Sequence, residues 1–296
     1  MLFLIGIGMG APKDLTERGV DLIRKSKLIF LEAYTSLLVE CAQFSEVDCS
    51  SACDTLERVS GCRLLETHLD LAEGSIQLAD RATVEEDAED LIIRPSLDSN
   101  VALLVVGDPF GATTHADLYL RAVNLGVSVE VVHNASIVTA VGCTGLQLYR
   151  FGETVSLCFW TDTWKPCSFF EKLIKNYNSG LHTLCLLDIK VKERSDEDIL
   201  RDRKVYQPPR FMTANQAAEQ ILYAIDYWST SEEQPCSITG NSLCVAALRL
   251  GSSSQRIVST SLKDLSVKEL GPPLHSLIIP SKDLHEIERD MLNIFN

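Results

Sequence analysis

The chain has 296 residues, of which 46% are hydrophobic, and its 27 Lys and Arg residues against 41 Asp and Glu residues give a formal net charge of −14. This length is sufficient for two domains, and the acidic balance works against binding a nucleic-acid backbone, which depends on clustered cations. No apolar run approaches the roughly 18 residues of a membrane span, and the N-terminus lacks a cationic segment and a small-residue cleavage site, so we expect a soluble, cytoplasmic protein.

Ten cysteines are too few for a disulfide scaffold in a chain of this length. Four lie in apolar runs and are expected to be buried: Cys143, Cys158, Cys185 and Cys244. Four others cluster near His68 without a CxxC pair, namely Cys41, Cys49, Cys53 and Cys62. Loop cysteines are the favoured interpretation of that cluster, a zinc site is the alternative, and we assign no metal.

The N-terminal stretch predicts a strand, a glycine turn and a helix. Leu2–Ile7 is an apolar run, glycines follow within residues 6–10, and Asp14 with Glu17 has the spacing of a capping box that begins a helix. Lys27–Glu32 is the next strand. Because a helix connects the two strands, we expect them to be parallel in one sheet.

The same stretch fits a dinucleotide-binding fingerprint. Gly6-x-Gly8-x-x-Ala11 has the required spacing, and Glu32 follows at the distance of a ribose-binding acid. Two features count against a dehydrogenase: the helix starts late, after Pro12, and Asp14 places a negative charge where a pyrophosphate would meet the helix dipole. Dinucleotide binding is therefore the less favoured alternative.

The next segment is weakly patterned. Residues 41–75 have too few apolar positions for a regular element, and we interpret them as a surface excursion. Thr83 and Glu86 have capping-box spacing, which predicts a helix that Pro95 terminates.

The stretch 101–115 is the strongest candidate for a ligand site. The apolar run Val101–Val106 stops abruptly at Gly107-Asp108-Pro109-Phe110-Gly111, and Ala112-Thr113-Thr114 then leads into a helix. A buried strand thus delivers a carboxylate, two glycines and exposed backbone to one point, as an open α/β sheet does where its strands end. A turn with only a backbone role is the alternative.

A second candidate loop follows the next strand. Leu118, Ala122 and Leu125 mark a helix face that ends at Gly126, and Val127–Val132 is the following strand. His133, Asn134 and Ser136 come next, and capping roles are the favoured interpretation of their side chains. We place a domain boundary here, with an α/β domain at 1–134 and a second domain at 135–296.

The second half predicts a mixed sheet with helices. Capping boxes at Ser168 with Glu171 and at Thr213 with Gln216 predict two helices. The two strands on either side of Gly251-Ser252-Ser253-Ser254 should pair as an antiparallel hairpin. The β-like runs are Thr154–Trp160, Thr183–Val191, Leu243–Leu250, Arg256–Ser261 and His275–Ile279.

The sequence contains no Walker loop, HExxH motif, nucleophile elbow or convincing Ser/His/Asp set. An enzyme with two α/β domains and glycine-rich strand ends but no nucleophile would most naturally bring two bound molecules together, with a cofactor carrying the reactive group.

Several long motifs resemble the diphthine synthases, the methyltransferases of diphthamide biosynthesis within the tetrapyrrole-methylase-like superfamily. The resemblance runs nearly end to end, and GDPFGATTH, HNASI, FWTDTW and LCLLDIKVKE are its most specific segments. The matching stretches are Leu2–Gly8, Leu31–Ser36, Val105–His115, His133–Ile137, Gly142–Leu148, Phe159–Trp164, His182–Lys192 and Pro273–Ile279.

This resemblance implies a two-domain α/β fold, with a mostly parallel N-terminal sheet and flanking helices, a mixed C-terminal sheet with helices, and a cofactor cleft between the domains. It also implies a homodimer that uses S-adenosylmethionine to modify a histidine derivative on translation elongation factor 2. The sequence is more similar to the eukaryotic branch, which methylates the amine three times and a carboxylate once to give diphthine methyl ester. We therefore expect four methyl transfers.

By residue-level match, the resemblance implies cofactor contacts at Met9, Asp108, Gly111, Ser136, Ile137, Leu187, Leu250 and His275. Asp108 is expected to hold the cofactor rather than to act as a base, and no catalytic residue is assigned. The family usually has another aliphatic residue where this chain has Met9. The stretch between Leu38 and Leu78 is longer and richer in cysteine than in the family, and an inert insertion is favoured over a role in docking the elongation factor.

Overall fold

The computed structural model describes residues 1–34, 38, 61–191, 193, 200, 201, 203, 205–231 and 236–296. The chain forms two compact units. The N-terminal unit consists of Met1–Val138, Ile189–Arg210 and Gly251–Ser253, and the C-terminal unit of Thr139–Asp188, Phe211–Leu250 and Ser254–Asn296. None of the described helices combines the length and hydropathy needed to cross a lipid bilayer.

The N-terminal unit contains a five-stranded sheet in the order β3-β2-β4-β1-β5, and every pairing in it is parallel. The prediction that the first two strands share one parallel sheet is confirmed, and β4 lies between them. The strands are β1 (Leu2–Gly6), β2 (Leu28–Glu32), β3 (Ile76–Ala79), β4 (Val101–Val105) and β5 (Val129–Val132).

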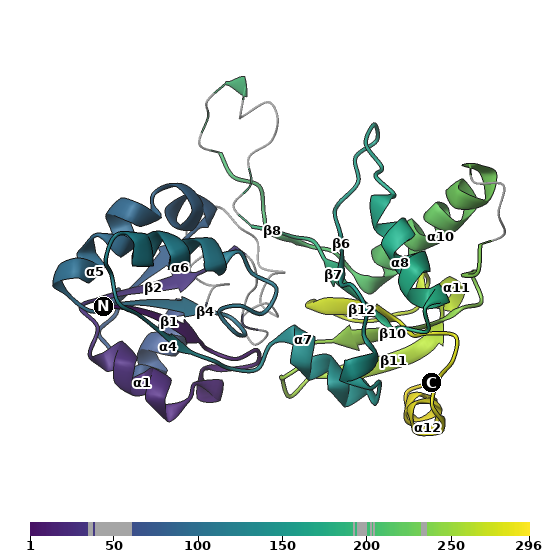
Figure 1. The fold of residues 1–296 in the computed structure, drawn as a ribbon, viewed down its shortest axis with the longest axis horizontal. Helices are drawn as coiled ribbons and strands as arrows, with labels where there is room; N and C mark the ends of the chain where they lie inside the picture. Colours follow the sequence, from purple (N-terminus) through teal and green to yellow (C-terminus); the bar gives the residue numbers. More distant parts are fainter. Residues whose placement is uncertain are drawn as a thin grey trace. The chain divides into compact units, whose positions relative to one another are not determined.

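Helices cover both faces of this sheet (Figure 1). Phe3 and Ile5 pack in one core with α1 and α4, whereas Leu2 and Leu4 face a second core with α6. Burial on both faces explains why the central strands β1 and β4 are continuous apolar runs rather than alternating ones. The helices are α1 (Glu17–Arg24), α4 (Cys62–Leu69), α5 (Pro95–Asp98) and α6 (His115–Asn124), and the π-helical turns are η2 (Ala82–Glu86) and η3 (Glu89–Ile93).

The first helix begins later than the sequence predicted. Asp14 ends a short 3₁₀ turn, η1 (Pro12–Asp14), and α1 starts at Glu17. Thr16 is the true cap, because its Oγ1 accepts a hydrogen bond from the Gly19 amide at 3.1 Å. The predicted pairing of Asp14 with Glu17 as a capping box is therefore wrong, and Asp14 has another role described below.

Two further predictions in this unit need correction. Helical structure ends at Ile93, just before Pro95 as predicted, but it consists of the π-helical turns η2 and η3, and Pro95 also opens α5, where the missing N–H of proline has no helical partner to lose. Residues 41–75 are not simply a surface excursion, because α4 buries Cys62, Leu65 and Leu69 in the core. Cys41, Cys49 and Cys53 lie outside the described residues.

The C-terminal unit contains a mixed five-stranded sheet in the order β11-β10-β12-β7-β6. The predicted hairpin is confirmed, since β10 and β11 pair antiparallel, and only the β6–β7 pairing within this sheet is parallel. The strands are β6 (Val155–Leu157), β7 (Thr183–Leu187), β10 (Leu243–Leu248), β11 (Arg256–Ser261) and β12 (His275–Ile279). A separate two-stranded sheet pairs β8 (Ile189–Lys190) with β9 (Arg210–Phe211).

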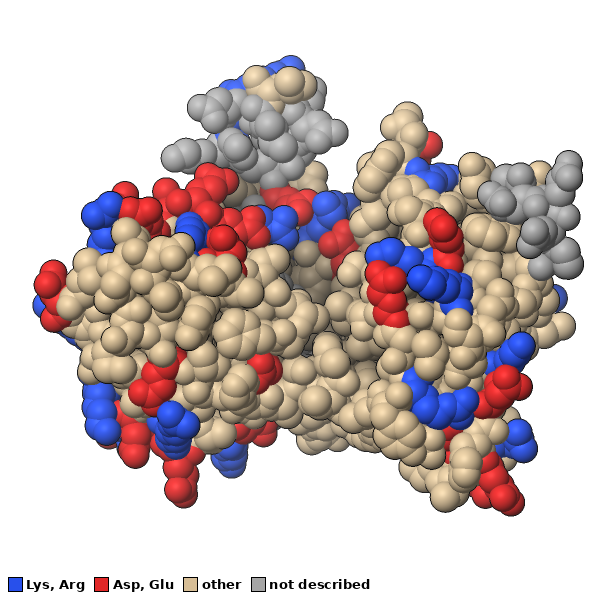
Figure 2. Space-filling view, viewed as in Figure 1, with Lys and Arg blue, Asp and Glu red and all other residues tan. Residues whose placement is uncertain are grey.

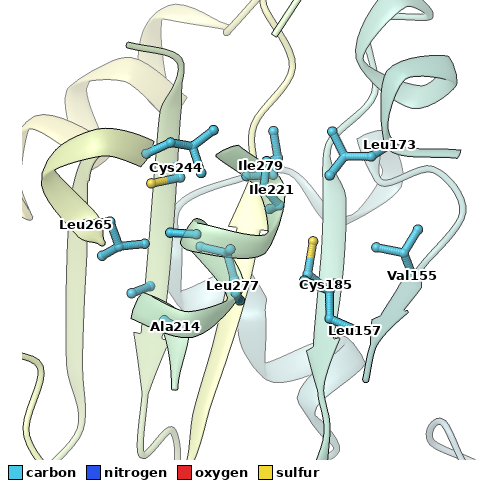
Figure 3. Packing of buried hydrophobic residues seen from close by; sticks show 14 of the residues in the cluster. Val155, Leu157, Leu173, Cys185, Ala214, Ile221, Cys244, Leu265, Leu277 and Ile279 are labelled. Atoms are coloured by element: carbon cyan, nitrogen blue, oxygen red, sulfur yellow. The ribbon is translucent and has the colours of Figure 1, made fainter. Parts of the chain in front are cut away.

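Helices α8, α10 and α11 pack against this sheet and form the core of the unit together with its strands. Figure 3 shows Ile221 of α10 among Leu277 and Ile279 of β12, with Cys185 and Cys244 on the neighbouring strands. The remaining helices are α7 (Ile137–Ala140), α8 (Ser168–Asn178), α10 (Ala214–Ser231), α11 (Leu262–Leu265) and α12 (Glu286–Ile294), with 3₁₀ turns η4 (Val141–Thr144) and η5 (Leu148–Arg150).

The cysteine and capping predictions in the second half are partly confirmed. Cys185 and Cys244 are buried, but Cys158 is only half-buried and Cys143 is exposed. Thr213 and Gln216 form the predicted reciprocal cap: the Thr213 amide donates to Gln216 Oε1 and the Gln216 amide donates to Thr213 Oγ1. The predicted cap at Ser168 is wrong, because Cys167 occupies the cap position without a side-chain hydrogen bond.

A buried carboxylate fastens α12 to the rest of the C-terminal unit. Glu288 is completely buried and accepts hydrogen bonds from Arg150 Nη1 at 2.8 Å and His182 Nε2 at 2.9 Å. The amides of Gln147 and His285 also donate to it, at 3.0 and 2.8 Å. Four donors satisfy both carboxylate oxygens, as a buried charge requires.

Candidate functional site

The loops that follow β1, β4 and β5 leave the same edge of the N-terminal sheet, because parallel neighbours end on one side. Two of the loops are joined directly: the Gly107 amide donates to the Gly8 carbonyl at 2.7 Å, and the Gly8 amide donates to the Gly107 carbonyl at 3.3 Å. Both glycines have positive φ, 76° and 82°, which a residue with a side chain rarely adopts.

Asn134 ties the loop after β5 to the loop after β1. Its Nδ2 donates to the Gly6 carbonyl at 3.0 Å and to the Asp14 carbonyl at 2.9 Å. The approach is close, since a Cβ on Gly6 would lie 2.9 Å from Asn134 Cβ and 2.6 Å from the Gly107 carbonyl oxygen. The three loops are therefore held together as one packed cluster, and this packing requires glycine at position 6.

The glycine turn binds a carboxylate from its own chain. Asp14 Oδ2 accepts hydrogen bonds from the Gly10 amide at 2.9 Å and the Ala11 amide at 3.1 Å. In a dinucleotide-binding protein, amides of this turn would face the pyrophosphate. Because Asp14 already occupies these donors and carries the same sign of charge as a phosphate, the geometry argues against the dinucleotide alternative.

Asp108 organises the loop after β4. Its Oδ1 accepts from the Phe110 amide at 2.9 Å, and its Oδ2 accepts from His133 Nδ1 at 2.9 Å and the Asn134 amide at 3.1 Å. Burial by itself would raise the pKa of this carboxyl, but the hydrogen bonds from Phe110, Asn134 and His133 outweigh it, so the pKa of Asp108 lies below its usual value. The carboxylate is ionised and mostly buried, whereas the His133 side chain is 71% exposed.

Gly111 lies directly against Ser136. A Cβ on Gly111 would be 2.6 Å from Ser136 Cβ and 2.8 Å from its Oγ, which is closer than real Cβ atoms approach. Ser136 is buried, and Ile137, which begins α7, follows it. Two residues that the resemblance assigned to the cofactor are thus in contact, and a third, Asp108, lies beside them.

Met9 lies at the other side of the same glycine turn. A Cβ on Gly251 would be 3.1 Å from Met9 Cβ, and a Cβ on Gly10 would be 2.1 Å from the Gly251 carbonyl oxygen. The turn Gly251–Ser253, which belongs to the N-terminal unit, therefore packs against Met9 and Gly10 with no room for a side chain at position 10.

The other three predicted contacts lie at one end of the C-terminal sheet. Leu187 is the last residue of β7, His275 is the first residue of β12, and Leu250 comes just after β10. Leu248 is opposite His275, and β7 and β12 are antiparallel neighbours in register, so the strand ends coincide. The structure brings these three residues to one edge of their own unit.

Both ring nitrogens of His275 already have partners. Nε2 donates to the Pro272 carbonyl at 2.9 Å, and the Ala214 amide donates to Nδ1 at 3.3 Å. Burial is the main cause that lowers the pKa of His275 to about 4, and the positive charge of Arg249 contributes in the same direction. The imidazole is therefore neutral at physiological pH and serves the fold around it.

Sequence reasoning missed how Asp14, His133 and Asn134 act. The spacing of Asp14 and Glu17 predicts a helix start at Asp14, and the loop composition predicts ordinary capping roles for His133 and Asn134. One signal was available for Asp14: a carboxylate a few residues after a glycine turn commonly accepts hydrogen bonds from the turn amides. Nothing local indicated that His133 and Asn134 would pair with Asp108.

The described side chains also limit which kind of ligand the candidate site can bind. Within the part of the chain that the structure describes, no group of three or more His, Cys, Asp or Glu side chains is arranged to hold a metal ion. Figure 2 shows acidic and basic side chains interspersed on the viewed face of each unit. The candidate site offers backbone groups, a satisfied carboxylate and apolar side chains, which suits a small organic ligand.

The sequence family of tetrapyrrole (corrin/porphyrin) methylases matches residues 1–266. The chain therefore belongs to this family and is a methyltransferase. It is 48% identical to diphthine methyl ester synthase from Mus musculus over 296 residues, covering 100% of this chain and 96% of the relative. The corresponding protein from Homo sapiens is 47% identical, with coverage of 100% and 95%.

Solved structures agree with this placement. The crystal structure of a putative diphthine synthase from Entamoeba histolytica matches with a TM-score of 0.77 and 37% identity, covering 100% of this chain and 98% of that chain. A second crystal structure of a diphthine synthase matches with a TM-score of 0.76 and 25% identity, covering 99% and 95%. Within the methylase family, the chain is one of the diphthine synthases, and the two-domain methylase-like fold that the sequence predicted is confirmed.

Proposed function

We propose that the chain transfers methyl groups from S-adenosylmethionine to the modified histidine of translation elongation factor 2, as a step in diphthamide biosynthesis. The observation that carries the proposal is the joined set of loops after β1, β4 and β5, which places Asp108, Gly111 and Ser136 together in a chain 48% identical to a diphthine methyl ester synthase. We propose four transfers, three to the amine and one to a carboxylate, giving diphthine methyl ester.

The residues present fit S-adenosylmethionine better than a dinucleotide. The amides of the glycine turn are bound to Asp14 and so are not a phosphate cradle. Glycine at positions 6, 10 and 111 lets the loops of the site pack against neighbouring residues where side chains would collide. When bound, S-adenosylmethionine supplies a methyl group activated by a sulfonium. Met9, Asp108, Gly111, Ser136 and Ile137 would hold it in the N-terminal unit, and Leu187, Leu250 and His275 would do so in the C-terminal unit.

Asp108 acts in this account as an anchor rather than a base. Its lowered pKa makes it a weak proton acceptor at neutral pH, and its oxygens already accept three hydrogen bonds. An attacking amine loses its proton to water before the transfer, and a carboxylate substrate has no proton to lose. The protein therefore contributes by fixing the distance and direction of the nucleophile relative to the methyl group.

The same resemblance supports three further proposals. The chain acts as a homodimer, works in the cytoplasm on elongation factor 2, and binds its cofactor between domains at 1–134 and 135–296. A cofactor-binding scaffold without turnover is the second candidate function, because binding motifs alone do not require catalysis.

Labelled S-adenosylmethionine, incubated with the chain and with elongation factor that carries the aminocarboxypropyl-histidine intermediate, separates these functions. Transfer of label to the elongation factor is the expected result. Binding of S-adenosylhomocysteine without transfer would support the scaffold, and binding of NADH in place of it would support the dehydrogenase.

A further inference from the structure

Arg249 is a buried cation at the edge where the predicted cofactor contacts of the C-terminal unit meet. It follows the last residue of β10, Leu248, and precedes Leu250. Its exposed fraction is 6%, and its φ of 49° lies in the left-handed region that residues with side chains seldom adopt. The chain therefore turns sharply at Arg249, and the direction of this turn sets where Leu250 lies.

The guanidinium joins two loops that are separate in the sequence. Nε donates to the Ser254 carbonyl at 3.1 Å, and Nη1 donates to the Pro272 carbonyl at 2.5 Å and the Leu270 carbonyl at 3.4 Å. The Arg249 amide also donates to the Leu274 carbonyl at 2.8 Å. The planar, forked guanidinium reaches both loops at once, which a single ammonium group cannot do.

One carbonyl links this cluster to His275. The Pro272 oxygen accepts from Arg249 Nη1 and also from His275 Nε2, at 2.9 Å. His275 Nδ1 in turn accepts from the Ala214 amide at the start of α10. A continuous set of contacts therefore runs from the turn after β10, through the loop before β12, to the first turn of α10.

Stability alone is a weak explanation for a buried arginine here. Transferring a guanidinium from water into the protein interior costs free energy. A well-packed apolar side chain at such a position often gives the folded protein equal or greater stability. The acceptors that the structure describes for Arg249 are backbone carbonyls of the loops next to His275 and close to Leu250. Such an arrangement is suited to holding loops in one conformation.

We propose that Arg249 is a positioning residue for the cofactor: it fixes the turn at Leu250 and, through the Pro272 carbonyl, the loop that carries His275. This proposal rests on the proposed function. The measurement is calorimetric binding of S-adenosylhomocysteine to the full chain, with wild type as reference, and circular dichroism checks that each variant is folded.

Arg249→Met removes the fork and keeps the length of the side chain. We expect it to bind S-adenosylhomocysteine at least about tenfold more weakly, because the loop carbonyls lose a charged donor. Arg256→Met is the matched control, since Arg256 lies on the same hairpin, is exposed and donates to the Glu269 carbonyl. The control should bind within about twofold of wild type.

A double-mutant cycle tests the link through Pro272. If Arg249 acts through the loop that His275 shares, Arg249→Met and His275→Gln together should weaken binding little more than the larger single effect. Fold-changes that multiply would overturn the proposal, because they would show two independent roles. Wild-type affinity in folded Arg249→Met would also overturn it.

If Arg249→Met does not fold, Arg249→Lys takes its place: reduced affinity in the folded lysine variant supports the proposal, and unchanged affinity contradicts it. If wild type does not bind S-adenosylhomocysteine, the proposed function fails. If wild type binds it and Arg249→Met binds it equally well, the positioning role of Arg249 fails and the proposed function stands.

Discussion

His133 Nδ1 lies 2.9 Å from Asp108 Oδ2, although 25 residues separate the two in the sequence. The same oxygen accepts from the Asn134 amide, so the carboxylate joins the loop after β4 to the loop after β5. Both loops carry residues assigned to the cofactor. Asp108 therefore holds the two loops together, and the anchoring of the cofactor that we propose for it also depends on its negative charge.

Replacing Asp108 should weaken cofactor binding. Asp108→Asn presents an amide group to donors at His133 and Asn134, and Asp108→Ala removes all three acceptor contacts. We expect each to weaken S-adenosylhomocysteine binding at least about tenfold, measured by calorimetry. Asp117→Asn is the control, because Asp117 is 71% exposed and pairs with Arg121 on α6. Unchanged affinity together with lost turnover would show that Asp108 acts in the chemical step instead.

The contact between Gly111 and Ser136 predicts that a substitution at position 111 destabilises the protein and that a second substitution at position 136 compensates for it. Gly111→Ala places a methyl group 2.6 Å from Ser136 Cβ, and the resulting overpacking should lower stability by about 1–3 kcal/mol. Adding Ser136→Gly makes room and should restore much of the loss. Urea denaturation measures both. If Gly111→Ala alone is as stable as wild type, the two loops can move apart without loss of folding free energy, which would contradict this prediction.

The buried imidazole of His275 should make stability depend on pH. Its pKa is 6.5 when unperturbed and about 4 in the folded chain, so the unfolded chain binds the proton more tightly. The stability contribution is therefore complete above pH 6.5 and is lost as pH falls toward 4. When the pH falls from 7 to 5, the free energy of unfolding of wild type should decrease by about 2 kcal/mol more than that of His275→Gln, whose side chain does not titrate in this range.

Urea denaturation of both proteins at the two pH values measures this difference. Equal losses in wild type and His275→Gln would mean that the imidazole is solvated or paired differently. Other groups titrate alike in both proteins, so the comparison isolates the single side chain.

The buried carboxylate of Glu288 should be important for folding. Glu288→Gln leaves Arg150 without its buried partner and offers an amide where a carboxylate accepts four hydrogen bonds. We expect a loss of about 3–5 kcal/mol, as for other broken buried ion pairs. Glu286→Gln is the matched control, because Glu286 is exposed on the same helix. Similar stability of the two variants, measured by urea denaturation, would contradict the burial of this network.

The strands could be predicted from sequence because burial on both faces leaves a simple signal. β1, β2 and β4 begin and end within about one residue of their apolar runs, and β11 and β12 match the predicted β-like runs. Helix starts were harder, because several polar residues near one boundary can cap it. Thr16 rather than Asp14 caps α1, and Pro95 follows the end of η3 as predicted but also opens a second helix, α5.

The site could be predicted only in outline. The abrupt end of β4 at Gly107 and Asp108 indicated a ligand loop, and the resemblance assigned the residues around it. Which groups Asp108 would bind depends on the sheet order, which places β1 between β4 and β5 and joins their loops. Local sequence does not encode that order, so the pairing of Asp108 with His133 could be seen only in the structure. The hydrogen bonds from the glycine-turn amides to Asp14 were likewise found only there.

The most direct test of the central claim is the intact mass of elongation factor 2 after reaction with the chain and S-adenosylmethionine. The substrate carries the aminocarboxypropyl-histidine intermediate, and a preparation with unmodified histidine is the control. We expect a mass increase of four methyl groups on the intermediate and none on the control. No increase on the intermediate, while the chain binds S-adenosylhomocysteine, would contradict it.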